Sequence, residues 1–447
     1  MASDLLPADL TMAEQSNAAQ RRRHLRASTF LLVCALLSSV AVLVKASIFD
    51  TLSHPPPDTG GLGYNSFAPA NTPGAIYVDP VFGSTVRRIT TDHALDDIYA
   101  RNMWWNADAT KYLHNTSIIN TLTGAETHTG IPGGSRSFDR GFDAADPNVL
   151  FYHSGSSIRQ VTLGAGGAKT DVLYLTTPAA TKSLGGTINW MDGSGRYMVV
   201  RYGSEPSVRV YDRQNLAAGP YTNAVNGANV EAGGYIGLTP DGNFVVSGDQ
   251  AWSINHATRT VSASGTHYWD LCGDHGSFVS ASDGRNYKIT SNCNDANEFW
   301  RVDITNDVAG QSPAAQKAAP HNLRLLALPS WNFAQHATAV TRGPMRDWAF
   351  MSVEDITDDF NVAVNSWLPY RSEIVGLNVV TGEIRRLVHH RSRSVELDYF
   401  YQPRLSTSWG GEVVGWASNF NHAGEVDIFI TPIQSGPGAP TSLRIVP

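Results

Sequence analysis

The chain has 447 residues, of which 42% are hydrophobic and only 16% are charged, and its formal net charge is −7. This composition excludes a disordered chain, because disorder goes with low hydrophobicity and high net charge. The negative charge also argues against nucleic acid as a partner, since binding phosphates requires a basic face.

The N-terminal segment has the pattern of a membrane anchor. Residues 1–26 form a polar tail that ends in a cluster of four arginines, and residues 27–46 are dominated by Leu, Val and Ala. The uncharged part of the second stretch is just long enough to cross a bilayer. The arginines hold the tail in the cytoplasm and place everything after residue 46 outside it. We therefore predict a single-pass signal anchor. Cleavage after Ala46, which would give a secreted protein, is the alternative.

Residues 47–75 differ in composition from the rest of the chain. They contain Pro55-Pro56-Pro57 and the pair Gly60-Gly61. Pro-rich and Gly-rich stretches are typical of linkers. We predict a stalk between the membrane and a folded domain.

From residue 76 to residue 435 the sequence repeats one pattern, a polar or Gly-containing turn followed directly by a short β-prone strand. The seven turns are residues 106–110, 144–148, 192–196, 239–243, 281–285, 343–346 and 409–412. Their spacing suits the blades of a propeller, which must stack into a closed ring because a four-stranded blade cannot bury both faces alone.

The pattern predicts an all-β fold, a seven-bladed β-propeller at residues 76–435 followed by a C-terminal tail at residues 436–447. Six or eight blades are the alternatives. Forty Gly, eleven Trp and sixteen Tyr favour turns and aromatic strands over helices. A short helix is expected only in the insertion at residues 312–321.

Two cysteines fall in one predicted blade. Cys272 and Cys293 form an even pair once Cys34, in the hydrophobic segment, is set aside. An oxidising compartment would allow a disulfide between them. Two buried thiols are the alternative, because the sequence does not fix their distance.

Several common catalytic motifs are absent from the sequence. It has no Gly-x-Ser-x-Gly elbow, no His-Glu-x-x-His helix, no phosphate loop and no Cys-x-x-Cys pair. Candidate chemistry lies instead where the blade strands begin, since the innermost strands of a propeller converge on its central channel. The candidates there are His275, His336, His389, Gln402 and Arg404.

These residue types suit a metal ion or an anion when they meet in one channel. Taken singly, each histidine could equally form a structural hydrogen bond to a neighbouring blade.

Three stretches near the C-terminus, residues 386–392, 401–406 and 414–420, carry a recognisable pattern of basic, His, Pro and Ser residues. They resemble the last blade of oligogalacturonate lyases and their propeller relatives. Residues 82–90 are similar to the start of exported propellers of the TolB-like kind. The resemblance spans residues 75–432 and implies β-elimination from a uronate, in which a metal neutralises the carboxylate and a histidine removes the adjacent proton.

The resemblance also implies roles for single residues. His275 falls near the family's general base, and His336 and Gln402 fall on ligands of one divalent metal ion, Mn or Ca. Gln402 replaces a histidine of the family, which weakens the expected site. His389 is a further candidate ligand or base. The last two candidates, Arg404 and Arg101, could hold the substrate carboxylate by a bidentate contact.

The sequence supports two hypotheses for the function. The first is an exported lyase that cleaves uronate-containing oligosaccharides. The second is a non-catalytic propeller that binds an acidic oligosaccharide or a protein ligand outside the membrane, because fold alone does not fix function. Both expect attachment to the membrane through the N-terminal helix and no nucleic-acid partner.

Overall fold

The structure of the chain is a computed structural model. It describes residues 48–56, 69–93, 100–133, 139–184, 188–203, 207–226, 236–271, 276–292, 297–330, 333–359, 367–395, 398, 401–420, 424 and 426–433. All of these fall in one contact unit, Ser47–Pro447. The predicted anchor at residues 27–46 and both predicted tails lie outside the described residues. Among the residues that are described, no helix is long and apolar enough to cross a membrane.

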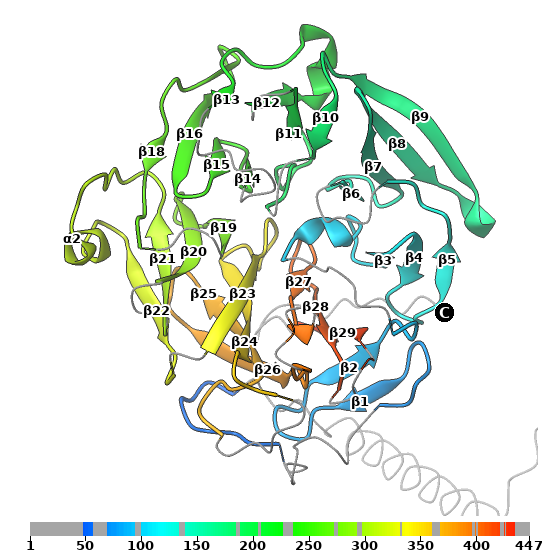
Figure 1. Cartoon of the computed structure of the whole chain (residues 1–447), viewed down its shortest axis with the longest axis vertical. Helices are drawn as coiled ribbons and strands as arrows, with labels where there is room; N and C mark the ends of the chain where they lie inside the picture. The colour runs from blue at the N-terminus through cyan, green and yellow to red at the C-terminus, as the bar shows by residue number, and fades with distance from the viewer. Residues whose placement is uncertain are drawn as a thin grey trace, which may run out of the picture. The chain divides into compact units, whose positions relative to one another are not determined.

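Strands dominate the described chain and form seven antiparallel sheets arranged around a central axis (Figure 1). The first sheets along the chain are β3 (Lys111–His114), β4 (Ser117–Asn120) and β5 (Glu126–His128); β6 (Arg140–Phe142), β7 (Val149–Ser154), β8 (Ser157–Leu163) and β9 (Lys169–Thr176); and β10 (Thr181–Ser183), β11 (Tyr197–Tyr202), β12 (Ser207–Asp212) and β13 (Val225–Asn226). The next are β14 (Ile236–Leu238), β15 (Phe244–Ser247), β16 (Gln250–Asn255), β17 (Thr260–Val261) and β18 (Thr266–His267); β19 (Gly276–Ser280), β20 (Asn286–Asn292), β21 (Glu298–Asp303) and β22 (Leu323–Ala327); and β23 (Phe333–Ala339), β24 (Trp348–Asp355), β25 (Glu373–Asn378) and β26 (Ile384–His389). The last sheet joins β1 (Ile76–Val78) and β2 (Thr85–Arg88) to β27 (Ser406–Thr407), β28 (Val413–Ser418) and β29 (Asp427–Pro432).

Helices are few and short in the described residues. They are α2 (Pro313–Lys317) and the 3-10 turns η1 (Asn102–Trp104), η2 (Ala165–Gly167) and η3 (Arg213–Ala218). The helix expected within residues 312–321 is confirmed as α2, which begins because the Ser312 side chain accepts a hydrogen bond from the Ala315 N–H at 3.3 Å.

The prediction of an all-β propeller is confirmed, but the count of seven four-stranded blades is wrong. In the described residues, six sheets have four or five strands and the seventh, β3–β5, has only three. The segment before β3 would supply its inner strand, but it folds into η1 and keeps a single bridge between Trp105 and Tyr112. The structure therefore has six complete blades and one incomplete sheet.

Four of the seven repeated turns share one local hydrogen bond. A polar side chain at the start of the turn accepts the N–H five residues later, at the start of the strand. This bond joins Asn106 to Lys111, Asp192 to Tyr197, Thr239 to Phe244 and Ser408 to Val413, at 2.7–3.2 Å. The third position after the acceptor has a positive φ, which explains Gly195 and Gly242 at that position.

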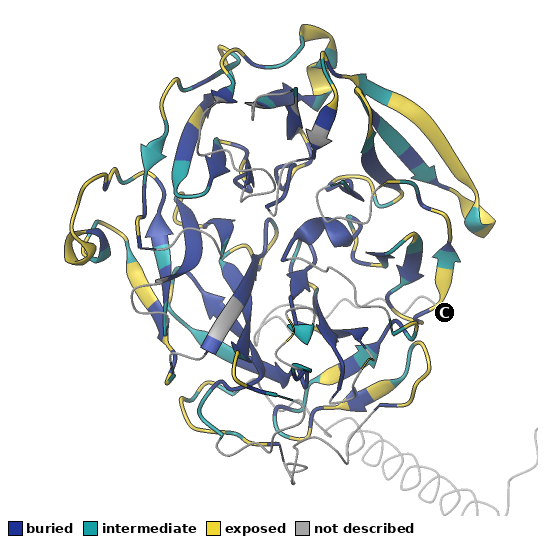
Figure 2. Cartoon of the chain, in the orientation of Figure 1, coloured by how far each residue is buried: buried dark blue, intermediate teal, exposed yellow. Residues whose placement is uncertain are grey.

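Buried residues follow the inner strands, whereas exposed residues gather on outer strands such as β9 (Figure 2). Inner strands of neighbouring sheets contact each other, as β19 does β23 and β23 does β27. Asn102 of η1 joins two sheets and the segment before β11, because its Nδ2 donates to the carbonyls of Ala339 and Thr407 and its Oδ1 accepts from Asn189.

The ring closes where β2, near the start of the propeller, pairs with β29, near its end. The register places Arg87 opposite Ile430 and Arg88 opposite Phe429. Below this pairing, the Asp427 carboxylate accepts hydrogen bonds from Arg88 and, at 3.1 Å, from the Thr90 hydroxyl. The Asp427 side chain is 1% exposed. A buried ion pair therefore fixes the closing sheet.

Replacing Asp427 with Ala should destabilise the protein strongly, because the Arg88 guanidinium would be left buried without its carboxylate. We expect the free energy of unfolding, measured by urea denaturation with tryptophan fluorescence, to fall by about 3–5 kcal/mol. The matched control is Glu383→Ala, which breaks a more exposed pair with Arg385 and should cost less than about 1 kcal/mol. Equal losses in the two variants would contradict a special role for the closing pair.

Candidate functional site

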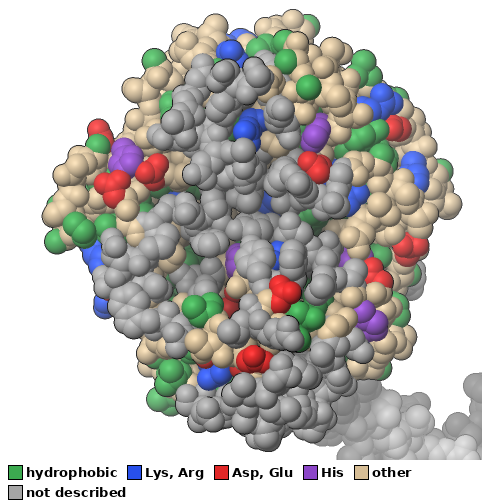
Figure 3. Space-filling model, in the orientation of Figure 1, with side chains coloured by type: hydrophobic (Ala, Val, Ile, Leu, Met, Phe, Trp, Pro, Cys, Tyr) green, Lys and Arg blue, Asp and Glu red, His purple; other side chains and the backbone are tan. Residues whose placement is uncertain are grey.

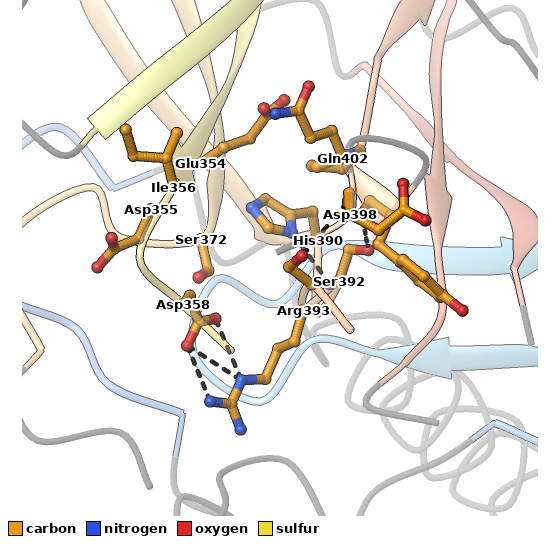
Figure 4. Close-up of a pocket in the computed structure, with 13 residues that line it drawn as sticks. Glu354, Asp355, Ile356, Asp358, Ser372, His390, Ser392, Arg393, Asp398 and Gln402 are labelled. Atoms are coloured by element: carbon orange, nitrogen blue, oxygen red, sulfur yellow. Dashed lines mark hydrogen bonds and ion pairs between the residues drawn. The ribbon is translucent and has the colours of Figure 1, made fainter. Parts of the chain in front are cut away.

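A small pocket lies where the sheet β23–β26 meets the segment that leads into β27 (Figure 4). Its volume is about 100 Å³, which is room for a few water molecules. The lining residues are Glu354, Asp355, Ile356, Asp358, Ser372, His390, Ser392, Arg393, Ser394, Asp398, Tyr401, Gln402 and Pro403.

Glu354 is the buried acid of this pocket. It stands near the end of β24, and its Oε1 lies 2.9 Å from Nδ1 of His336 on the adjacent strand β23. The same oxygen accepts a hydrogen bond from the Ser352 hydroxyl at 2.8 Å. Burial opposes ionisation of Glu354, but the contacts with His336 and Ser352 outweigh it, so the pKa of Glu354 lies below its ordinary value. The pocket wall therefore carries a negative charge.

Two oxygen atoms in the pocket are buried without a donor. Glu354 Oε2 and Gln402 Oε1 have no hydrogen-bond partner in the part of the chain that the structure describes. The two side chains reach toward one another beside His390 (Figure 4). Buried acceptors normally find a donor or a cation. The two unsatisfied oxygens of this pocket therefore fit a positively charged ligand.

His390 forms the pocket wall between these groups and is held in one neutral form. Its Nε2 donates to the Val353 carbonyl at 3.0 Å, and its Nδ1 accepts from the Ser392 N–H at 3.1 Å. Burial lowers the pKa of His390 to about 4. Both ring nitrogens are engaged, so the ring shapes the pocket and is not placed to act as a base.

Two of the predicted metal ligands come together here. Gln402 lines the pocket, and His336 holds Glu354 from behind, although His336 is not itself a lining residue. Glu354 was not among the residues predicted from the sequence. The signal that could have found it is an acidic pair, Glu354-Asp355, that ends the buried strand β24.

The structure separates His389 from this group. Its ring packs against Phe82, with 4.8 Å between the ring centroids, and its backbone N–H donates to Asp79 at 3.0 Å. Burial opposes ionisation of Asp79, but the contacts with His389 outweigh it and lower the pKa of Asp79 to about 2. His389 does not line the pocket.

The two predicted arginines are both buried, and neither lines the pocket. Arg101 precedes η1, and one of its terminal nitrogens lies 3.3 Å from the Met103 sulfur. Burial lowers the pKa of Arg101 to about 9. Arg404 lies just before β27. The predicted base, His275, and both cysteines of the proposed pair lie outside the described residues.

A second group of side chains that could bind a metal ion lies at the surface. Ligand atoms of Asp249, His267 and Asp270 fall within 4.8 Å of one another. These side chains are 21–38% exposed, and the two aspartates contact His267. This group matters as a competing site in any metal-binding experiment. Elsewhere on the described part of the face in Figure 3, acidic and basic side chains are interspersed.

The sheet topology defines the chain as an all-β propeller. No family model matches the chain, and no curated protein matches it.

Solved structures resemble the chain only at low identity. The β-propeller domain of Cps50 (Swd1) from Myceliophteria thermophila has 11% identity and a TM-score of 0.42, with 75% of this chain and 99% of that chain covered. The WD40 domain of coronin from Toxoplasma gondii has 8% identity and a TM-score of 0.42, covering 87% and 90%. Hydrazine synthase from Kuenenia stuttgartiensis has 13% identity and a TM-score of 0.34, covering 65% and 93%.

The His390 environment predicts a dependence of stability on pH. The folded-state pKa of about 4 lies below the ordinary value of 6.5. The contribution of His390 is therefore complete above pH 6.5 and is lost as the pH falls toward 4, with a slope of up to about 1.4 kcal/mol per pH unit. In urea denaturation across this range, His390→Gln should flatten the slope, whereas His321→Gln, at an exposed residue, should keep it. If the stability of His390→Gln kept the wild-type slope with pH, His390 would not be the source of the pH dependence.

Proposed function

We propose that the protein is a ligand-binding propeller whose pocket at Glu354 and Gln402 binds a divalent cation. The observation that carries this proposal is a pair of buried oxygens, Glu354 Oε2 on an ionised carboxylate and Gln402 Oε1, each without a hydrogen-bond partner in the described chain. A cation would satisfy both oxygens at once. An apolar ligand would leave them unsatisfied.

The donor set favours a hard cation. Carboxylate and amide oxygens suit Ca²⁺, Mg²⁺ and Mn²⁺ better than softer metals. Glu354 and Gln402 would supply two oxygens, so water or an external ligand must supply the remaining positions. A carboxylate from an acidic oligosaccharide or an acidic protein segment would complete the coordination. Such a ligand would reach the cation from outside the blade, because the pocket lies at one end of it.

His336 supports this site by holding Glu354, without lining the pocket itself. A histidine that donates Nδ1–H to a carboxylate fixes the orientation of that carboxylate. The 2.9 Å contact between His336 and Glu354 has this form. His336 therefore acts on the cation through Glu354.

Isothermal titration of the full chain with Mn²⁺ tests the site directly. We expect Glu354→Gln to weaken binding by about tenfold or more, because the variant removes the charge and keeps the shape. The control variant His267→Ala disrupts the surface group of Asp249, His267 and Asp270 and should leave the pocket affinity unchanged. Full affinity in Glu354→Gln, or complete loss in His267→Ala, would contradict the proposal.

A second candidate function is β-elimination from uronates. It is favoured because Gln402 and the His336–Glu354 pair meet at one pocket, and the resemblance to oligogalacturonate lyases implies metal ligands at His336 and Gln402. A bound cation would neutralise the carboxylate of the sugar.

The lyase candidate predicts an unsaturated, ultraviolet-absorbing product when the full chain is mixed with polygalacturonate and Mn²⁺ or Ca²⁺. His275→Ala should abolish the product while leaving Mn²⁺ affinity at the wild-type value. Absence of product from the wild-type protein would leave ligand binding as the function. Full activity in His275→Ala would remove that histidine as the base.

A further inference from the structure

A second, larger hollow lies at the opposite end of the strand pair β23–β24. Glu354 stands near the end of β24, whereas this hollow is formed around the turn that joins β23 to β24. Its volume is about 520 Å³, which is the size of a site for a small organic ligand. The lining residues are Gly193, Ser194, Pro240, Asp241, Ser280, Ala281, Gly284, Arg285, Thr341, Arg342, Gly343 and Arg346.

The hollow is built from the repeated turns. Four of the seven turns line it, and Arg342 reaches the carbonyls of two others. Its Nη2 donates to the Ala107 carbonyl at 2.6 Å, and its Nη1 donates to the carbonyls of Ala144 and Gly193. The remaining turn begins at Trp409, whose ring lies 6.0 Å from the Arg342 guanidinium carbon. All seven turns therefore meet around one arginine.

The charge of Arg342 is not neutralised by these contacts. Carbonyl groups are neutral, and Arg342 forms no ion pair with any described residue, although the Glu412 and Asp143 carboxylates are near enough to interact with its charge. A guanidinium has five N–H donors, and three of them are used. Two N–H donors of a guanidinium that has no direct ion pair therefore remain for a ligand.

A second cation stands nearby without a partner. Arg346 is exposed, and among the described residues its side chain makes no hydrogen bond or ion pair. Arg285, the third arginine of the lining, is paired with Asp303 at 3.1 Å. The one lining carboxylate, Asp241, already accepts hydrogen bonds from the side chains of Asn243 and Asn286.

We propose that this hollow binds a small organic polyanion that carries two or more carboxylate or phosphate groups. Arg342 would hold one anionic group at the axis and Arg346 would hold another at the rim, since guanidinium groups bind both oxyanions by paired, charge-assisted hydrogen bonds. The hollow is positive in a chain whose net charge is −7. The site is independent of the cation pocket and does not rest on the function proposed for it.

Isothermal titration of the full chain with citrate and with pyrophosphate tests this site and separates the two anionic groups. Binding of citrate alone supports a carboxylate ligand, and binding of pyrophosphate alone supports a phosphate ligand. The affinity should fall as salt is added. If neither anion binds at low salt, the proposal is overturned.

Arg346→Ala is the variant that locates the binding. Its exposed side chain makes no contact that folding needs, so the variant should melt at the wild-type temperature and bind the anion about tenfold more weakly. The matched control is Arg159→Ala on β8, which removes a partly exposed arginine outside the hollow and should bind as the wild type does. Wild-type affinity in Arg346→Ala would overturn the proposal, as would an equal loss in Arg159→Ala.

Discussion

Closure of the ring is the constraint on which the rest of the structure depends. Each blade buries its faces only against its neighbours, so an open ring would expose two of them. The pairing of β2 with β29 and the buried contact between Arg88 and Asp427 prevent this. The pocket at Glu354 and Gln402 depends on the same closure, because Glu354 belongs to the blade β23–β26 and Gln402 leads into the closing sheet.

The two ends of the strand pair β23–β24 have opposite chemistry. One end presents buried oxygen acceptors around an ionised Glu354, and the other presents Arg342 and Arg346. β24 has eight residues, so at about 3.3 Å per residue its first and last residues lie about 23 Å apart. This distance exceeds the screening length at physiological salt, about 8 Å. The two proposed sites would therefore hold ligands of opposite charge without influencing each other's affinity.

The sequence predicted the features that depend on local bonds and missed those that depend on neighbours in space. The repeated turn was found because its hydrogen bond joins residues five apart, as in Asp192 and Tyr197. The missing inner strand before β3 was not found, because η1 is fixed by contacts of Asn102 with distant sheets. His389, and not its neighbour His390, was the predicted site residue, because the sequence does not show which of two successive side chains faces a pocket. The structure places His390 in the pocket and His389 against Phe82.

Glu354 is also the residue whose presence folding alone explains least. A buried carboxylate destabilises a protein unless its oxygens are satisfied, and His336 and Ser352 satisfy only Oε1. A neutral residue at position 354 would avoid this cost and still fill the end of β24. The unsatisfied Oε2, in a pocket with room for a few water molecules, is therefore the feature on which the proposed cation site rests.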